Sequence, residues 1–152
     1  MKELEALISE LENKILKQQV LNKAISTAPV GWHIQHSLLT IMVIIERLKQ
    51  SDPKEYYWKF NWGRLFVFAI NKIPRGAAQS PDVVKPKGDI TVESLTRTAG
   101  TTREKIKQLK GLHPNNYFVH PYFGKLNFAR ACRFLRIHTK HHLTIINDII
   151  GK

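Results

Sequence analysis

Apolar side chains recur every three to four residues along most of the chain, the spacing that puts them on one face of an α-helix. The first such stripe runs from Leu4 to Ile15, with Glu and Lys between its members. Proline, glycine and short polar clusters separate the stripes. The pattern predicts helices over residues 3–23, 27–50, 56–72, 90–111 and 126–150, with Thr27 capping the second and Pro29 in its first turn.

Two connections lack this pattern. The first, "IPRGAAQSPDVVKPKGD" over residues 73–89, contains three prolines and two glycines, which predicts irregular structure. The second, "LHPNNYFVHPYFG" over residues 112–124, reads as turn-rich with two His-Pro pairs. The aromatic segment 56–72 has strand propensity too, but its length and its helical neighbours favour a helix. The simplest architecture is an all-α bundle of four main helices plus one shorter helix, in a single domain over residues 1–152.

Composition indicates a globular chain that does not need disulfides. The 152 residues are 43% hydrophobic and 24% charged, which is ordinary for a soluble domain. A single cysteine, Cys132, excludes an intrachain disulfide framework and fits a reducing cytosol. The longest nearly apolar run, Leu38–Ile45, is far shorter than the roughly 20 residues of a membrane span, and the first residues do not resemble a signal peptide. We therefore expect a cytoplasmic protein with no membrane partner.

The formal net charge of +12 is concentrated beyond residue 50. Residues 1–50 carry six basic and five acidic side chains, residues 51–110 carry twelve and six, and residues 111–152 carry six and one. A basic surface of this kind attracts nucleic acid, an acidic partner or an anionic substrate. Because the chain has no Arg/Gly-rich tract, cysteine finger or basic tail, nucleic-acid binding is the less favoured alternative.

The last predicted helix holds three of the seven histidines within five positions. Two of them lie in its apolar stripe, which alternates spacings of four and three and consists of Ala131, Leu135, His138, His142, Ile145 and Ile149. His141 lies well to one side of this stripe. The basic side chains of the same helix lie on nearly the opposite face, which predicts a solvated surface, and they are Arg133, Arg136 and Lys140.

Two imidazoles one helical turn apart can bind a single metal ion, as in the helical zinc motif of metalloproteases. The segment "HTKHH" lacks the glutamate that serves as general base there, which argues against a protease. The alternative is a pair of core histidines held by hydrogen bonds. A metal also needs a third ligand, and both His33 and His36 lie near the start of the second helix. The helical wheel favours His36 only slightly, because His33 lies among Ser37 and Thr40 and is expected to be more exposed.

Four segments, "GWHIQHSLL", "IPRGAAQSP", "HPYFGKLNF" and "HTKHH", together resemble the DinB-like superfamily over most of the chain, least over the first helix. The resemblance implies a four-helix bundle in up-down-down-up order and a divalent metal bound by three histidines. By position, these ligands are His36, His138 and His142. The resemblance also implies relatives that are metal-dependent thiol-S-transferases or a thiol-dependent isomerase, and frequent homodimers.

Three neutral imidazoles leave coordination positions open for water or substrate, which is typical of a catalytic metal. Zinc and nickel both suit imidazole, and either ion lowers the pKa of a bound water or thiol. We therefore expect a metal-dependent transferase or hydrolase that acts on a small molecule, with a low-molecular-weight thiol as a candidate cofactor. Two other functions remain open: a non-catalytic bundle that a metal stabilises or that senses metal, and a nucleic-acid-associated protein.

Two further features lie outside the proposed ligand set. His120, in the "HPYFG" turn before the last helix, is a candidate acid/base group at the mouth of the bundle, and the alternative is that it only orders the turn. The long connection over residues 73–89, with Arg75 and Lys85, is expected to cover that mouth and contact an anionic substrate, or else to be solvated surface.

Overall fold

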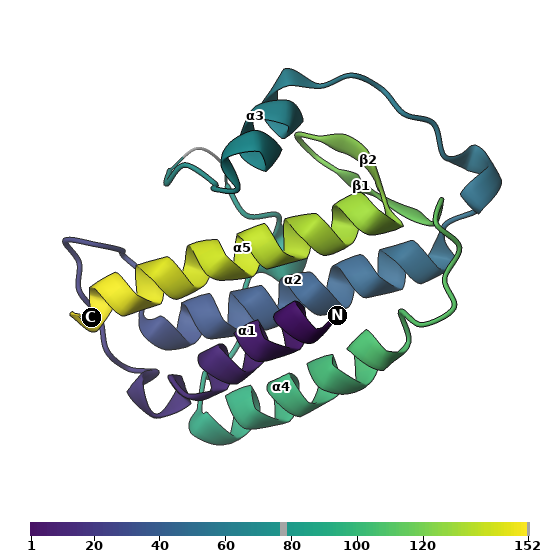
Figure 1. Cartoon of the computed structure of the whole chain (residues 1–152). Coiled ribbons are helices and arrows are strands. Elements are labelled where there is room, and N and C mark those ends of the chain that lie inside the picture. Colours follow the sequence, from purple (N-terminus) through teal and green to yellow (C-terminus); the bar gives the residue numbers. More distant parts are fainter. Residues whose placement is uncertain (77–78, 152) are drawn as a thin grey trace.

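The computed structural model describes residues 1–76 and 79–151. Over these residues the chain is mostly helical, with one small sheet. The elements are α1 (Lys2–Glu12), α2 (Val30–Gln50), α3 (Trp62–Ile70), α4 (Val92–Lys107), β1 (Tyr117–His120), β2 (Gly124–Asn127) and α5 (Phe128–Ile149). The four long helices α1, α2, α4 and α5 pack together, and Figure 1 shows α1 and α5 running one way and α2 and α4 the other.

The apolar stripes of the four long helices meet in one core. Its largest fully buried side chains come from every one of these helices and include Ile8, Leu11, Ile34, Leu38, Ile41, Ile45, Leu48, Leu95, Ile106, Leu135 and Ile146. Burial of each such side chain contributes on the order of 1.5–3 kcal/mol to the stability of the fold, because its apolar surface is removed from water. The buried stripe predicted for α5 is confirmed at its apolar positions, Ala131, Leu135, Ile145 and Ile149.

The first helix is shorter than predicted, and the reason lies at the start of α2. Helix α1 ends at Glu12, and a 3₁₀ turn over Ile15–Lys17 follows it. The backbone carbonyls of Gln18 and Val20 then accept hydrogen bonds from the first two amides of α2, those of Gly31 (2.8 Å) and Val30 (3.0 Å). These amides have no partner within their own helix. The N-cap of α2 is therefore Pro29, with no side-chain cap, and the prediction of Thr27 as the cap is wrong.

Gly31 lies where two segments approach too closely for a side chain. A Cβ at this position would lie 2.9 Å from Cγ2 of Ile90 and 3.0 Å from both Cβ and O of Gln18. We expect Gly31→Ala to destabilise the fold by about 1–3 kcal/mol, because the crowded backbone of Gln18 must move. Gly100→Ala is the matched control: a Cβ there meets nothing within 4 Å, so the same substitution inside α4 should stabilise by about 0.5–1 kcal/mol. Urea denaturation of both variants tests this, and equal effects would contradict it.

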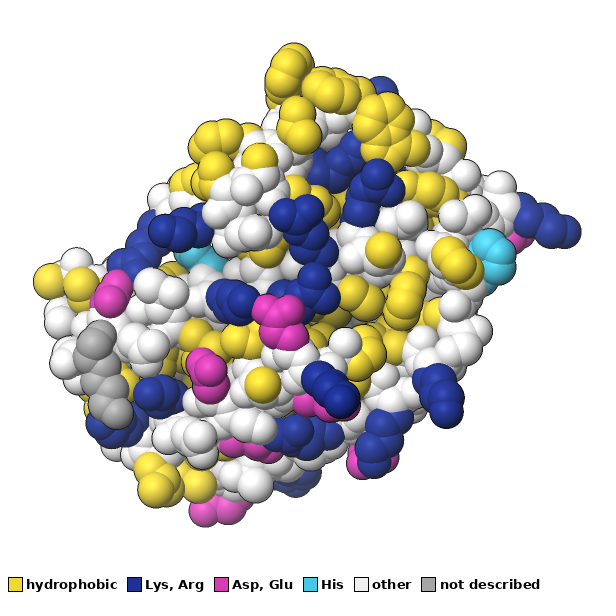
Figure 2. Space-filling view, in the orientation of Figure 1, with side chains coloured by type: hydrophobic (Ala, Val, Ile, Leu, Met, Phe, Trp, Pro, Cys, Tyr) yellow, Lys and Arg dark blue, Asp and Glu magenta, His cyan; other side chains and the backbone are white. Residues whose placement is uncertain are grey.

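The aromatic segment predicted as a helix over 56–72 is helical only from Trp62. Asn61 caps α3 by accepting a hydrogen bond from the amide of Arg64 (2.7 Å), and Asn71 ends the helix in the left-handed region (φ 51°). The buried side chain of Arg64 donates hydrogen bonds to the carbonyls of Phe123 and Lys59, which ties α3 to the β-hairpin. The outer face of α3 is apolar, and Figure 2 shows hydrophobic side chains gathered over it at the top of the view.

The β-hairpin departs from the all-α prediction. Strands β1 and β2 pair antiparallel with Tyr117 opposite Asn127 and His120 opposite Gly124. This is the region predicted as a turn-rich connector, and its aromatic and β-branched residues suit a short half-buried strand. The hairpin leads directly into α5, because Asn127 also caps that helix by accepting from the amide of Arg130. The hairpin therefore connects His120, the last residue of β1, directly to the start of α5.

The remaining elements follow the predictions with shorter bounds. Helix α4 starts with a capping box between Thr91 and Ser94 and continues through Gly100. The connection over 73–89 is irregular apart from a 3₁₀ turn at Asp82–Val84, and residues 77–78 lie outside the described residues. In the described ranges, no helix combines the length and apolarity that crossing a membrane requires.

The basic side chains of α5 are exposed or half-exposed, in line with the predicted solvated surface, and they also contact neighbouring helices. Arg136 Nε and Lys140 Nζ lie 3.1 Å and 2.6 Å from the carboxylate of Glu3 on α1. Arg133 donates to the backbone carbonyl of Phe68 on α3. These residues fasten α5 to its neighbours, so part of the positive charge stabilises contacts between helices.

Candidate metal centre

Three histidine rings converge where α2 and α5 pack together. His36 comes from α2, and His138 and His142 come from successive turns of α5. One ring nitrogen of each lies within 4.8 Å of those of the other two. Nε2 of His36 and Nε2 of His138 lie 3.2 Å apart. The pair on one turn of α5 and the early histidine of α2 therefore lie together in space.

Hydrogen bonding leaves Nε2 of His36 free to bind an ion. Its other ring nitrogen, Nδ1, lies 2.8 Å from the backbone carbonyl of Val84. A carbonyl only accepts, so Nδ1 carries the proton and donates, and Nε2 of the neutral ring keeps its lone pair. Val84 belongs to the long irregular connection, which thereby orients His36 from outside the bundle. This is the outer contact that a metal-binding histidine usually has.

His33 is buried almost as deeply as His36, with 4% of its surface exposed against 2%, so the exposure expected for His33 is not found and does not separate the two early histidines. Its Nδ1 lies 3.0 Å from Nδ1 of His142, and its Nε2 lies 3.0 Å from the hydroxyl of Ser26. In the tautomer in which Nδ1 of His142 donates and Nδ1 of His33 accepts, Nε2 of His142 is unprotonated and available to the cluster. His33 therefore orients His142 as Val84 orients His36, a role that the sequence analysis missed.

We expect His33→Ala to weaken zinc binding by about 10–100-fold, because His142 loses the partner that fixes its ring. His33→Asn should recover part of this loss, since its amide oxygen can take the place of Nδ1. His141→Ala is the matched control, because the His141 ring also contacts His142 edge-on but shares no hydrogen bond with it among the described contacts. Competition with a chromophoric zinc chelator measures all three affinities. An equal loss in His33→Ala and His141→Ala would contradict the orienting role.

Burial keeps these imidazoles neutral. Desolvation is the largest cause in each case: it lowers the pKa of His33 to about 4, lowers the pKa of His36, and holds those of His138 and His142 well below their ordinary value. Positive charge on one ring would further disfavour it on the next. At neutral pH the lone pairs are therefore available to a cation.

The donor set, and the spacing of one of its pairs, fit a divalent ion. Tetrahedral zinc with Zn–N bonds of about 2.0–2.1 Å separates two ligand nitrogens by about 3.3 Å. The 3.2 Å between Nε2 of His36 and Nε2 of His138 is close to this value. His138 also has a buried Nδ1 without a hydrogen-bond partner among the described residues. An ion at Nε2 would place the ring proton on Nδ1, so this unpartnered atom does not itself favour the ion, and His138 lacks the outer contact that His36 has.

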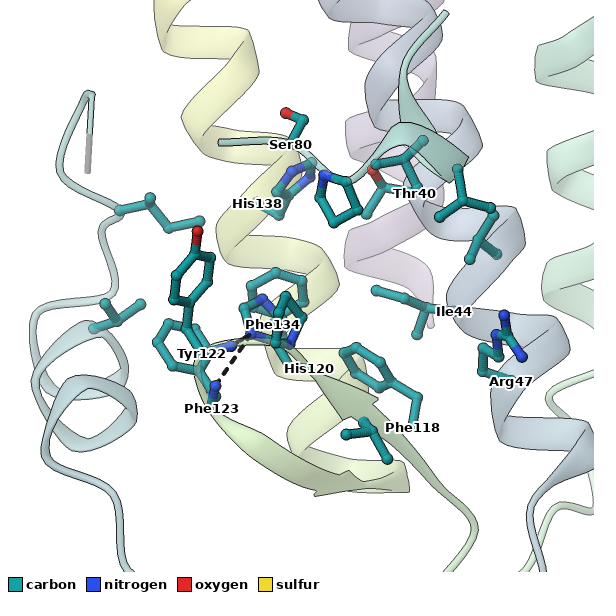
Figure 3. A pocket seen from close by; sticks show the side chains of 18 of the residues that line it. Thr40, Ile44, Arg47, Ser80, Phe118, His120, Tyr122, Phe123, Phe134 and His138 are labelled. Atoms are coloured by element: carbon teal, nitrogen blue, oxygen red, sulfur yellow. Dashed lines mark hydrogen bonds between the residues drawn. The ribbon is translucent and has the colours of Figure 1, made fainter. Parts of the chain in front are cut away.

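The three rings form part of the wall of an open cavity of about 970 Å³. His141 also borders the cavity but is not part of the converging group. His120, the candidate acid/base residue, lines the cavity too, and its Nδ1 accepts hydrogen bonds from the amides of Tyr122 (3.1 Å) and Phe123 (3.2 Å). Figure 3 shows His120 and His138 on different walls, from the hairpin and from α5. His120 thus both orders its turn and borders the cavity.

A family model described as the DinB superfamily matches residues 2–146 of the chain. The chain belongs to the DinB superfamily. The match includes both segments that carry the converging histidines, so the resemblance inferred from four short motifs is confirmed. No curated protein and no solved structure matches this DinB-superfamily chain.

Proposed function

We propose that His36, His138 and His142 bind a divalent metal ion, zinc or nickel, and that the chain is a metal-dependent enzyme. The observation that carries the proposal is the convergence of one nitrogen from each ring within 4.8 Å. The hydrogen bond to Val84 supports it, because it leaves Nε2 of His36 unprotonated. The contact with His33 does the same for His142 in the tautomer in which Nδ1 of His142 donates to Nδ1 of His33. Neutral imidazoles are the histidine form that binds metals.

The cavity beside the cluster favours catalysis over a purely structural metal. Structural zinc sites are closed by four protein ligands, whereas catalytic sites keep a position open. Here three rings border a cavity large enough for a small molecule. A divalent ion bound there would supply a Lewis acid that lowers the pKa of a water or thiol. The reaction class that follows is transfer of a thiol or hydrolysis, on a small-molecule substrate and, for transfer, with a low-molecular-weight thiol as cofactor.

Elemental analysis of the purified chain, followed by activity screens, tests this proposal. We expect about one equivalent of metal per chain, and hydrolysis or thiol-transfer activity that is lost on chelation and restored by zinc or nickel. Metal binding that raises stability without any activity in either screen would instead support a non-catalytic, metal-stabilised bundle. A chain that holds no metal after loading with either ion would overturn the proposal.

We also propose that α1, α2, α4 and α5 form the up-down-down-up bundle of the superfamily, and that the chain is a homodimer. The helix directions visible in Figure 1 support the first statement. The second follows only from the family resemblance. Sedimentation equilibrium should give twice the chain mass, and a single-chain mass at every concentration would contradict the dimer.

A further inference from the structure

The cavity beside the histidine cluster has an apolar body. The side chains that line it come from α2, α3, the long connection, the hairpin and α5, and include Ile44, Val67, Val83, Phe118, Phe123 and Phe134. Among the described lining residues there is no aspartate, glutamate or lysine, and Arg47 is the one permanently charged group. A ligand that fits this cavity is therefore mostly apolar and carries no positive charge.

Successive turns of α2 run along the cavity. His36, Thr40, Ile44 and Arg47 recur at intervals of four, four and three residues and all line it, and Figure 3 shows the last three on consecutive turns. A rise of about 1.5 Å per residue separates the backbones of His36 and Arg47 by roughly 16 Å. The histidine cluster and the arginine thus lie well apart along the cavity wall, and Gln50 and Ser51 continue the lining beyond Arg47.

The wall between the cluster and Arg47 offers little hydrogen bonding from α2. The Thr40 hydroxyl donates to the backbone carbonyl of His36 (2.8 Å), so its proton is already used within the helix. Ile44 is apolar. Arg47, by contrast, is exposed and makes no ion pair with any described carboxylate. Its charge is therefore available to an anionic group in that part of the cavity.

His120 adds one directed hydrogen-bond donor. Its Nδ1 accepts from two backbone amides and cannot carry a proton. Burial lowers the pKa of the ring to about 4, so at neutral pH the single ring proton is on Nε2. No described residue accepts a hydrogen bond from this atom. Fixed in this tautomer, His120 has no lone pair to serve as a general base, and it offers Nε2–H to an acceptor on the ligand.

We propose that the cavity binds an elongated, mostly apolar carboxylate, with its negative charge at Arg47 and the opposite end of the molecule at the histidine cluster. His120 donates a hydrogen bond to an oxygen that the natural ligand carries along its length. That the ligand reacts at the end that lies at the histidine cluster rests on the proposed function. The binding of the carboxylate does not rest on it. The ligand class is thus defined by length, apolar surface and a terminal carboxylate.

Calorimetric titration of linear carboxylates tests the proposal, with hexanoate, octanoate, decanoate and dodecanoate as probes and EDTA present to keep metal away. We expect affinity to rise by about fourfold per methylene up to a limiting length, as burial of each methylene predicts. Decanamide, the neutral analogue, should bind about fivefold more weakly than decanoate. Affinity that ignores chain length, or equal affinity for amide and carboxylate, would overturn the proposal.

Two pairs of variants locate the ligand. Arg47→Gln should remove the preference for decanoate over decanamide, whereas Arg97→Gln, at an exposed position of α4 outside the cavity lining, should preserve it.

For His120 the probe is a decanoate with a mid-chain ketone. His120→Asn keeps an acceptor for the turn amides, but its side chain is too short to place a donor where Nε2 lies. The affinity of this variant for the ketone probe, relative to its affinity for decanoate, should therefore fall about fivefold. His120→Gln, whose amide nitrogen approximates Nε2, should restore that ratio. Unchanged preferences in Arg47→Gln or His120→Asn would contradict the assigned contact.

The outcome is separable from that of the proposed function. Length- and charge-dependent binding in a chain that holds no metal would leave the ligand site standing and overturn the metal enzyme. A metal-dependent activity, in a chain whose carboxylate binding depends on neither the length nor the charge of the ligand, would support the metal enzyme and overturn the ligand site.

Discussion

Replacing any one of His36, His138 and His142 with alanine should weaken zinc binding by at least about 100-fold. A structural zinc site binds with about 10–16 kcal/mol shared among four ligands, so one ligand is worth on the order of 3 kcal/mol. The three rings converge from two helices, and each supplies one nitrogen to the group, so the losses should be similar in size. Competition with a chromophoric chelator gives the affinities, and elemental analysis gives the stoichiometry.

Two further histidine variants serve as controls. His113 lies in the connector before the hairpin and outside the cavity lining, and His141 borders the cavity outside the converging group. His113→Ala and His141→Ala should both bind zinc within about threefold of the unmodified chain. Circular dichroism of each metal-free variant shows whether its fold is intact. A folded His142→Ala variant with unchanged zinc affinity would rule out the proposed ligand set.

The histidine pair on α5 could be predicted because its placement depends on helical geometry alone. Once a segment is helical, residues four apart share a face, and flanking apolar residues show which face is buried. His138 and His142 satisfied both conditions. The partner from α2 is different, because its choice required knowing how two helices separated by about 100 residues face each other. The wheel alone left His33 and His36 open, and the family resemblance favoured His36.

The burial of His33 was missed because the small polar residues around it suggested a solvent-exposed face of the helix. Ser37 and Thr40 made that side of α2 look solvated, yet both are buried. Their hydroxyls donate to backbone carbonyls four residues earlier, those of His33 and His36, at 2.8 Å each. A hydroxyl satisfied in this way can be buried without a tertiary partner. The only signal in the sequence was the three-residue spacing of the two histidines, which puts them on neighbouring parts of one face.

The hairpin and the cavity wall could not be predicted for a related reason. Strands of four residues carry almost no periodic signal, and the His-Pro pairs around β1 favoured turns. The contact of the Val84 carbonyl with His36 depends on the path of an irregular connection that no residue pattern specifies. The mutual packing of long helices follows from periodicity, whereas the groups that orient the candidate ligands come from loops whose course is set by tertiary contacts.

Mild acid should unfold the metal-free chain by protonating its buried histidines. The pKa values of His33 and His120 are lowered by burial from 6.5 to about 4, and those of His36, His138, His141 and His142 are lowered as well. In the unfolded chain these rings bind protons as the pH falls through about 6.5, while in the folded chain they stay neutral. The unfolded state therefore binds more protons, and the free energy of unfolding falls as the pH falls.

Between pH 6.5 and 5, each buried histidine that stays neutral should reduce the free energy of unfolding by about 2 kcal/mol, since one pH unit corresponds to about 1.4 kcal/mol. Carboxylates contribute little in this window, because those with shifted values, such as Glu3 and Glu46, have pKa values lowered from 4.5. Urea denaturation in EDTA at pH 7, 6 and 5 measures the slope, and His120→Asn should make it shallower by removing one such ring. A free energy of unfolding that stays constant or rises toward pH 5 would show that the rings are accessible to protons in the folded chain. That result would remove the physical basis for treating them as neutral metal ligands.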